Sequence, residues 1–277
     1  MDEAARHVES LNWARFERLV VLSPHLDDAV LSCGALLHWL RAALPRLVVT
    51  ACAGDPPQPS LTARGGAGSD SAPAQSEPKL TPPAERRRED AQAMQQLGCS
   101  FVHLGLSDAF DRRPARESLR QRMAALWEPP AAAERLHRDA LESCLNLMLE
   151  GTGPTLLLAP LAIGGHVDHR LCATIALAMA ERGQPVLFYE DVPYVAAPER
   201  FGGFPADDAR SAAARLGRSL MEPLYCPVEI DTKMQWVNHY ASQVQMLFGN
   251  AEQARETIGQ RRLRGIQAEV FWQVAKH

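Results

Sequence analysis

The stretch Leu19-Val20-Val21-Leu22-Ser23-Pro24-His25-Leu26-Asp27-Asp28-Ala29-Val30 joins a strand pattern to a helix pattern. Residues 19–23 form a short apolar run that predicts a buried strand, and residues 28–43 have the pattern of a helix. A histidine and two adjacent carboxylates lie between them. Ligands of open α/β sheets bind outside the carboxyl ends of the strands, so this junction is the expected place of a functional site.

The same order of strand and helix recurs along the chain. Apolar runs predict strands at 46–52, 101–104, 155–160 and 185–189, and helical patterns predict helices at 85–97, 133–149 and 168–182. The run at 155–160 has no polar alternation, which is typical of a sheet covered on both faces. We therefore expect an α/β fold of the Rossmann-like, doubly wound type, with a mostly parallel sheet and helices on both faces. The last third adds an expected strand near 228–230, a helix at 232–248 and an apolar run at 266–274.

Length and composition narrow the class of protein. The chain has 277 residues, of which 46% are hydrophobic, and a net charge of −4. The length allows one large α/β domain or two small ones, of which a single domain over 1–277 is expected, and the negative charge argues against binding to nucleic acid through its phosphates. No apolar run approaches the roughly 20 residues that span a bilayer, so no stable membrane insertion is expected. The charged N-terminal stretch and six scattered cysteines predict a cytoplasmic protein without a signal peptide.

Residues 56–83 differ in composition from the rest of the chain. They hold seven of the 20 prolines and almost no large apolar side chains. Burial therefore cannot offset the entropy lost on ordering, which favours a flexible surface insertion. The alternative is a lid over an active site, because long loops that follow strands often gate one.

Two clusters of polar residues carry the chemistry. In the first, His25, Asp27 and Asp28 would be costly to bury unless a cation shares them. Neighbouring side chains point in different directions, so we expect His25 and Asp28 to bind a metal together and Asp27 to remain free to act on water. The second cluster, Gly164-Gly165-His166-Val167-Asp168-His169-Arg170, follows the strand that ends at Pro160.

The two clusters can face each other where the strand order of the sheet reverses. His25, Asp28 and His169 then offer two imidazoles and one carboxylate with an open position for water, as catalytic zinc requires. Zn²⁺ is favoured, and other divalent ions such as Fe²⁺ or Co²⁺ are the alternatives. A purely structural interpretation makes Asp27 or Asp28, and also Asp168, caps of the helices that follow. That interpretation leaves the histidines unexplained.

These motifs resemble those of the PIG-L/LmbE-like zinc-dependent N-deacetylases, a family that includes N-acetylglucosaminyl deacetylases. The family's Pro/Ala-His-Pro-Asp-Asp-Glu motif is matched by residues 24–29 and its His-Pro-Asp-His motif by residues 166–169. Its Arg-x-x-Glu helix, which ends in Leu-Gly, is matched by residues 86–89 and 97–98. The chain departs from the first motif at Leu26 and Ala29, where the family has Pro and Glu. Neither position is a metal ligand in that pattern.

The resemblance implies a zinc-dependent hydrolase that removes an N-acetyl or other N-acyl group from an amino sugar or a related small metabolite. In this chemistry Asp27 is the general base. His166 would stabilise the oxyanion that forms from the amide carbonyl. Asp168 would hydrogen-bond a histidine of the site and fix its orientation.

Four further residues are candidates for binding the polar part of the substrate. They are Arg86, Glu89, Asp108 and Tyr189. The alternative is that Arg86 and Glu89 belong to a solvated helix face, that Asp108 lies in a turn, and that Tyr189 closes a buried strand end.

Three other functions compete with the deacetylase. An amidase acting on a larger acyl group or a thiol conjugate would use the same zinc chemistry in a wider pocket. A phosphoesterase usually needs two metals about 3.5–4 Å apart, and only one ligand set is visible in the sequence. A metal-stabilised binding protein would need a closed site of four ligands, whereas three ligands and a spare base predict an open one.

Overall fold

The computed structural model describes residues 5–57, 81–113, 117–128, 134–151, 153–201 and 207–275. Most of the expected insertion, residues 58–80, lies outside this part of the chain. The described strands form one nine-stranded sheet in the order β1-β7-β9-β6-β5-β2-β3-β4, with β8 paired to β9.

The part of the sheet that contains the two sequence motifs is parallel. Its strands are β2 (Arg18–Ser23), β3 (Arg46–Thr50), β4 (Ser100–His103), β5 (Thr155–Pro160) and β6 (Val186–Tyr189). From β2 the chain runs outward through β3 and β4, and it then returns to the other side of β2 as β5 and β6. The order therefore reverses between β2 and β5, and the expected doubly wound α/β fold is confirmed.

The remaining strands extend the sheet beyond β6. The apolar run at 266–274 forms β9 (Ile266–Trp272), which is antiparallel to both β6 and β7 (Leu224–Pro227). Two short strands complete the sheet, β1 (Arg6–His7) beside β7 and β8 (Arg262–Leu263) beside β9. The expected strand at 228–230 is wrong. The strand ends at Pro227, and Ile230 already begins α9 (Ile230–Val237), where Ile230, Met234 and Val237 repeat at helical spacing.

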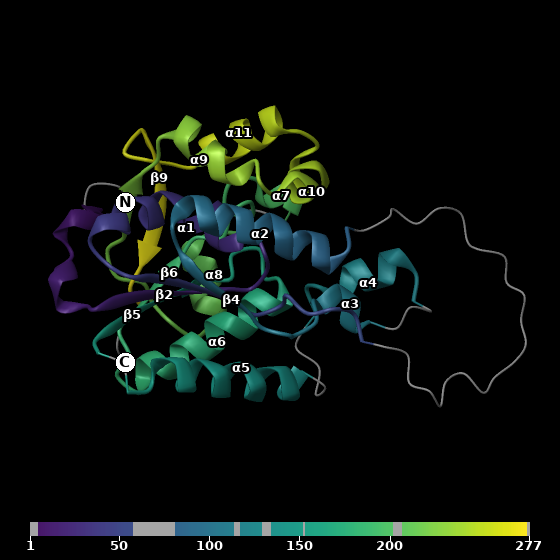
Figure 1. Ribbon diagram of the computed structural model, residues 1–277, viewed down its shortest axis with the longest axis horizontal. Coiled ribbons are helices and arrows are strands. Elements are labelled where there is room, and N and C mark those ends of the chain that lie inside the picture. The colour runs from purple at the N-terminus through teal and green to yellow at the C-terminus, as the bar shows by residue number, and fades with distance from the viewer. Residues whose placement is uncertain are drawn as a thin grey trace, which may run out of the picture.

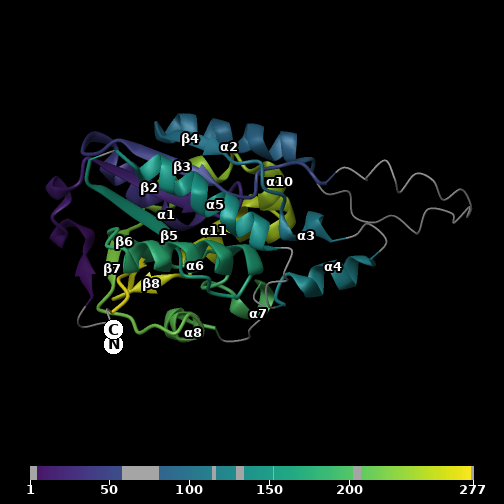
Figure 2. The same ribbon diagram turned by 90° about the horizontal axis from the view of Figure 1, so that it is seen from below.

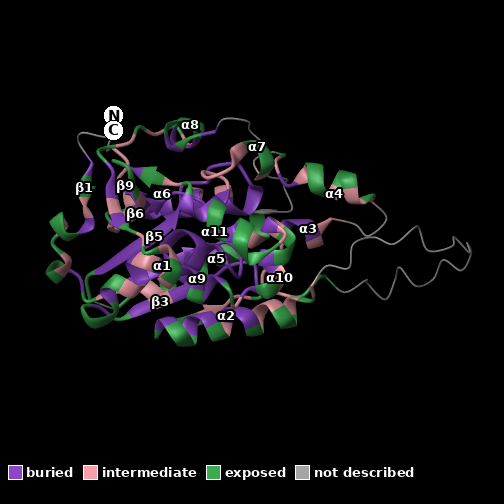
Figure 3. Cartoon of the chain, turned by 90° about the horizontal axis from the view of Figure 1, so that it is seen from above, coloured by how far each residue is buried: buried purple, intermediate pink, exposed green. Residues whose placement is uncertain are grey.

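Helices cover both faces of the sheet (Figure 1). One face carries α1 (Asp28–Trp39), α2 (Pro83–Leu97), α9 and α11 (Ala251–Gly259), and the other carries α5 (Glu134–Leu149), α6 (Val167–Glu181) and α8 (Ala209–Arg215). Alternate side chains of β2 enter the two cores, with Leu19 and Val21 in the first and Val20 and Leu22 in the second. Figure 3 shows the buried sheet between helices whose outer faces are exposed. No described helix is long and apolar enough to cross a membrane.

Local signals set the bounds of α2. Proline occupies the first turn at Pro83, where its missing N–H costs no hydrogen bond, and Gly98 ends the helix with φ 65°. The expected helix at 232–248 is instead interrupted after Val237 and continues as α10 (Ala241–Gln243) and the π-helix η5 (Val244–Phe248). The Tyr240 hydroxyl at this break donates to Asp90 of α2 at 2.7 Å. The break therefore coincides with a tertiary contact, and no glycine or proline in the sequence predicts it.

Short helices complete the fold. The 3-10 helices η1 (Val8–Ser10), η2 (Trp13–Arg15) and η3 (Leu40–Ala42) lie near the N-terminus and after α1. Figures 1 and 2 both place α3 (Ala109–Arg112), α4 (Leu119–Ala125) and α7 (Pro198–Phe201) at the same end of the molecule as α10. Phe110 and Leu126 pack against Val167 at the start of α6, and the Val167 amide donates to the Leu126 carbonyl at 2.8 Å. The segment α3–α4 is thereby joined to the second sequence motif.

Candidate metal centre

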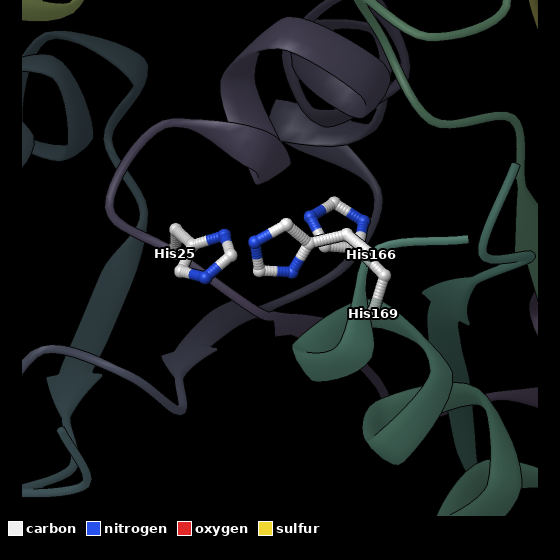
Figure 4. Close-up of side chains that lie close together, drawn as sticks. All are labelled: His25, His166 and His169. Atoms are coloured by element: carbon white, nitrogen blue, oxygen red, sulfur yellow. The ribbon is translucent and has the colours of Figure 1, made fainter. Parts of the chain in front are cut away.

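The two sequence motifs meet at the carboxyl end of the parallel strands. His25 lies in the loop from β2 to α1, and His166 and His169 lie at the start of α6, after β5. Figure 4 shows the three imidazole rings turned toward one another from these two segments. Each ring offers a nitrogen within 4.8 Å of the others. Residues that are about 140 positions apart in the chain therefore form one cluster at the reversal of strand order, as expected for this fold.

The β2 loop is folded by its own polar side chains. The Ser23 hydroxyl donates to the His25 carbonyl at 2.7 Å and accepts from the Ala29 amide at 3.1 Å. The Asp28 carboxylate accepts from the His25 amide at 2.9 Å through Oδ2. Asp27 occupies the cap position of α1, but its side chain makes no capping hydrogen bond. The helix-cap interpretation therefore does not explain Asp27.

The β5 loop places His166 and His169 by a different set of contacts. The amides of Ile163 and Gly164 donate to the carboxylates of Asp191 and Asp207, at 2.9 and 2.8 Å. The side chain that caps α6 belongs to His166, whose Nδ1 accepts from the Asp168 amide at 3.2 Å. Asp168 is therefore not the cap, and its carboxylate is available to other groups.

His169 presents an unpaired nitrogen to the site. Its Nδ1 lies 2.6 Å from Asp191 Oδ1, and since a carboxylate can only accept, Nδ1 carries the proton. Its Nε2 is buried, has no hydrogen-bond partner among the described residues, and lies 3.3 Å from Asp28 Oδ2. A histidine whose one ring nitrogen donates to a carboxylate has the arrangement of a metal ligand.

His25 is arranged in the same way from the opposite side. Its Nε2 lies 3.1 Å from Asp168 Oδ2, and its Nδ1 lies 3.2 Å from Asp28 Oδ2. Burial raises the pKa of Asp168. The hydrogen bond and the charge of His25, together with the guanidinium of Arg112, outweigh burial and hold the pKa of Asp168 well below the usual value. Asp168 is therefore ionised and accepts from Nε2, so that the lone pair of the neutral His25 ring lies on Nδ1.

The chemistry of these three donor atoms fits a divalent cation. Two imidazole lone pairs converge on one oxygen of Asp28, an arrangement that is repulsive unless a positive charge lies among them. Ligand atoms at about 2.0–2.1 Å from a tetrahedral ion are about 3.3–3.4 Å apart. His25 Nδ1 and His169 Nε2 lie 3.2 and 3.3 Å from Asp28 Oδ2, which agrees with that spacing. Protons compete with a cation for these ring nitrogens. Burial lowers the pKa of His169, but the charges of Asp28 and Asp191 outweigh it and raise this pKa to about 9.

His166 differs from the other two histidines in its protonation. Because its Nδ1 accepts from a backbone amide, the proton of the neutral ring is on Nε2. Burial and the neighbouring His25 lower the pKa of His166 to about 3, so the ring is neutral at physiological pH. His166 therefore offers the site a hydrogen-bond donor and no lone pair. Distance alone groups the three imidazoles, but their proton positions separate His166 from His25 and His169.

Asp27 is the free carboxylate of the site. It is buried, and among the described residues none donates a hydrogen bond to its oxygens. Burial and the charge of Asp28 raise the pKa of Asp27 to about 6, although Arg86 and the two histidines oppose this shift. A carboxylate with this pKa is ionised at neutral pH and can still accept a proton, as a general base must.

Two of the four substrate-binding candidates lie at the site. Asp108 Oδ2 is 3.5 Å from His25 Nε2 and 3.8 Å from Arg86 Nη1. The side chains of Asp108 and Arg86 are 20% and 18% exposed, so both can be reached from solvent.

The other two candidates have structural partners instead. Glu89 accepts from the Ser242 amide at 2.8 Å and from its hydroxyl at 2.5 Å, and so joins α2 to α10. Tyr189 is fully buried, and its hydroxyl donates to the Leu22 carbonyl at 3.0 Å. These buried, satisfied contacts favour the structural alternative for Glu89 and Tyr189, and their contact with a substrate stays a prediction.

Sequence reasoning missed three residues beside the cluster. Asp191 follows the end of β6 at the same edge of the sheet, and this position was the available signal for it. Arg112 contacts Asp168 at 2.6 Å, but nothing in the sequence pairs these two residues. The Tyr194 ring lies 5.3 Å from the His169 ring and packs on Gly164. A Cβ at Gly164 would lie 2.4 Å from Tyr194 Cδ1, so this position requires glycine.

Known proteins are similar to this chain in sequence and in fold. The PIG-L family model, described as GlcNAc-PI de-N-acetylase, matches residues 20–180. A 2'-N-acetylparomamine deacetylase of Niallia circulans is 30% identical over 263 residues, which cover 91% of this chain and 88% of that protein. The enzyme of the same description from Streptomyces fradiae is 32% identical over 181 residues, which are 64% of this chain and only 57% of that relative. The crystal structure of the zinc-inhibited form of teicoplanin deacetylase superimposes with a TM-score of 0.66 at 26% identity, covering 93% of this chain and 98% of that one.

The fold, the His/Asp cluster and these similarities together define a hydrolytic N-deacetylase. The chain belongs to the PIG-L family, because the family model matches more than half of it. The zinc-inhibited structure and the cluster of imidazoles and carboxylates support a divalent metal at the site.

Proposed function

We propose that this protein removes the acetyl group from the nitrogen of an amino sugar, with zinc as the ion and Fe²⁺ or Co²⁺ as alternatives. The observation that carries the proposal is the convergence of two imidazole lone pairs on Asp28, beside the free carboxylate of Asp27. The relatives named for acetylated paromamine indicate the substrate class. The six cysteines are all free, which suits the reducing conditions of the cytoplasm.

His25, Asp28 and His169 would hold the ion. When bound there, a divalent ion supplies Lewis acidity toward the amide carbonyl and lowers the pKa of water. Asp27 takes a proton from the attacking water while the new carbon–oxygen bond forms. As the carbon–nitrogen bond breaks, the same carboxyl passes the proton to the leaving amine, so that the products are acetate and the free amino sugar.

The remaining residues act on the carbonyl and on the sugar. The Nε2–H of His166 donates to the oxygen that becomes negative, and a donor of this kind contributes on the order of 3 kcal/mol. Arg86 in α2 and Asp108, the cap residue of α3, face the site and would bind hydroxyl or amino groups of the substrate. An unpartnered base beside three ligands argues against a closed site in a binding protein.

The test is acetate release from N-acetylated amino sugars, N-acetylparomamine and N-acetylglucosamine among them, with the metal content measured on the same samples. We expect release by the wild type, and a 10²–10⁴-fold lower rate with unchanged metal content in Asp27→Asn. A metal-loaded wild type that releases no acetate, but cleaves a longer N-acyl chain, would replace the deacetylase by an amidase. An Asp27→Asn variant that retains full activity would overturn the assignment of the base.

A further inference from the structure

Asp168 is the meeting point of three segments of the chain. Its carboxylate accepts from His25 Nε2 at 3.1 Å, from the Ala109 amide at 2.9 Å and from Arg112 Nη2 at 2.6 Å. The first two contacts use Oδ2 and the third uses Oδ1, and the side chain is fully buried. Both oxygens of Asp168 are thus occupied, and the carboxylate has one orientation.

Arg112 determines that orientation from the end of α3. While Nη2 contacts Asp168, Nη1 donates to the Ser107 carbonyl at 2.8 Å. The guanidinium group is planar and rigid, so two acceptors on different segments fix both its position and its rotation. The Arg112 side chain is 12% exposed, whereas the Asp168 side chain that it contacts is fully buried.

The segment Ser107–Arg112 also carries the substrate-binding candidate Asp108. Asp108 accepts from the Phe110 amide at 2.9 Å through Oδ1 and thereby caps α3. Its Oδ2 faces His25 Nε2 and Arg86 Nη1. Arg112 contacts the Ser107 carbonyl next to Asp108 and also the Asp168 carboxylate. It therefore connects the position of Asp108 to the carboxylate that orients His25.

We propose that Arg112 is a positioning residue for His25, acting through Asp168, and that it couples the Ser107–Arg112 segment to the affinity of the site for a divalent ion. The proposal rests on the metal site of the proposed function. With Arg112 fixing Asp168, the Nε2–H of His25 has a stationary acceptor, and Nδ1 stays directed at the cation position beside Asp28. Without Arg112 the carboxylate turns, and the His25 ring loses its orientation.

The experiment is the affinity of metal-free protein for Zn²⁺, measured by competition with a chromophoric chelator. We expect Arg112→Gln to bind Zn²⁺ about 10–100-fold more weakly than the wild type, the range found when partners of metal-binding histidines are removed. Arg112→Lys retains the charge but cannot bridge two acceptors with a fixed fork, so its affinity should fall between the two.

Arg113 provides the matched control. It is the neighbouring arginine, its side chain is 37% exposed, and it pairs with Glu117 at 2.8 Å, away from Asp168. Arg113→Gln should bind Zn²⁺ like the wild type, and thermal unfolding of the metal-free proteins shows whether each variant is folded. If Arg112→Gln unfolds early, Arg112→Lys carries the test.

The outcomes separate this proposal from the proposed function. Folded Arg112 variants that bind Zn²⁺ as tightly as the wild type, or an equal loss in Arg113→Gln, would overturn the role of Arg112. A wild type that binds no divalent ion would overturn the metal site and this proposal together. A wild type that binds Zn²⁺ but releases no acetate would overturn only the reaction, because the affinity ratio of the variants does not depend on turnover.

Discussion

Each of the two candidate histidine ligands contacts a buried aspartate, but the two aspartates are held by very different parts of the molecule. His169 donates to Asp191, a fully buried residue just beyond β6 whose other oxygen accepts from the Ile163 amide. His25 contacts Asp168, whose carboxylate is held by Arg112 and the Ala109 amide of the short helix α3.

This difference assigns distinct physical roles to the two sides of the site. The His169 side is part of the interior, so changes there should affect folding as well as metal binding. The His25 side is held by a short helix at the rim, which also bears Asp108, so changes there should affect metal binding and substrate binding more than folding. A site that must bind an ion firmly and still admit a substrate benefits from one support of each kind.

The largest effect that tests this comparison is expected from Asp191→Asn. Asparagine has only one accepting oxygen. Its NH₂ group therefore lies against one of the two donors, the Ile163 amide or His169 Nδ1–H, which loses its acceptor. We expect Zn²⁺ affinity to fall about 10–100-fold and the free energy of unfolding to fall by about 1–3 kcal/mol. Chelator competition and denaturant unfolding measure the two quantities, with the exposed Asp231→Asn as a control. A loss of affinity with unchanged stability would show that the His169 side is not part of the rigid interior.

The pH dependence of the reaction tests Asp27, the carboxylate that belongs to neither histidine's support. A general base must be ionised, and burial and Asp28 raise the pKa of Asp27 to about 6. A bound cation lowers this value. We therefore expect kcat/KM to fall about tenfold per pH unit on the acid side of a midpoint at or below about 6. An acid limb centred above pH 7 would contradict Asp27 as the base.

The smallest effects are expected from substitutions of Arg86 and Glu89, the two named residues of the Arg-x-x-Glu motif, which should differ in kind. Arg86→Ala should raise KM about tenfold, which corresponds to a charged hydrogen bond of roughly 1.5 kcal/mol. Glu89→Ala should lower the free energy of unfolding by about 1–3 kcal/mol, because the Ser242 amide loses its acceptor, and should leave KM within about twofold. Steady-state kinetics and denaturant unfolding of both variants are the measurements. A KM that rises only in the Glu89 variant would reverse the two roles.

The sequence predicts the parts of the site that lie next to each other in the chain. His25 and Asp28 are close because the strand-to-helix turn after β2 is short, and His166 and His169 are three positions apart at the start of α6. The apolar run of β5 placed the second motif at the same edge of the sheet as the first. The doubly wound fold follows from the same pattern.

The supports of the site could not be predicted in this way. Arg112 reaches Asp168 across 56 positions, and Asp191 reaches His169 across 22. Both contacts depend on how separate segments pack, which no local pattern encodes. The contact of Glu89 with Ser242 could not be predicted for the same reason. From the sequence alone, the charge of Glu89 is compatible with a solvated or a substrate-facing position. The expected strand at 228–230 failed because a short apolar run does not distinguish a strand from the first turn of a helix.

The most direct measurement is the Zn²⁺ affinity of His169→Ala beside that of His166→Ala. Both histidines are buried, lie three positions apart at the start of α6, and belong to the same cluster of imidazoles. The proton positions make only His169 a ligand. We expect His169→Ala to lose more than the roughly 100-fold found for outer partners, and His166→Ala to stay within about threefold of the wild type while its turnover falls. Equal losses in the two variants, or a loss only in His166→Ala, would contradict the ligand set of His25, Asp28 and His169.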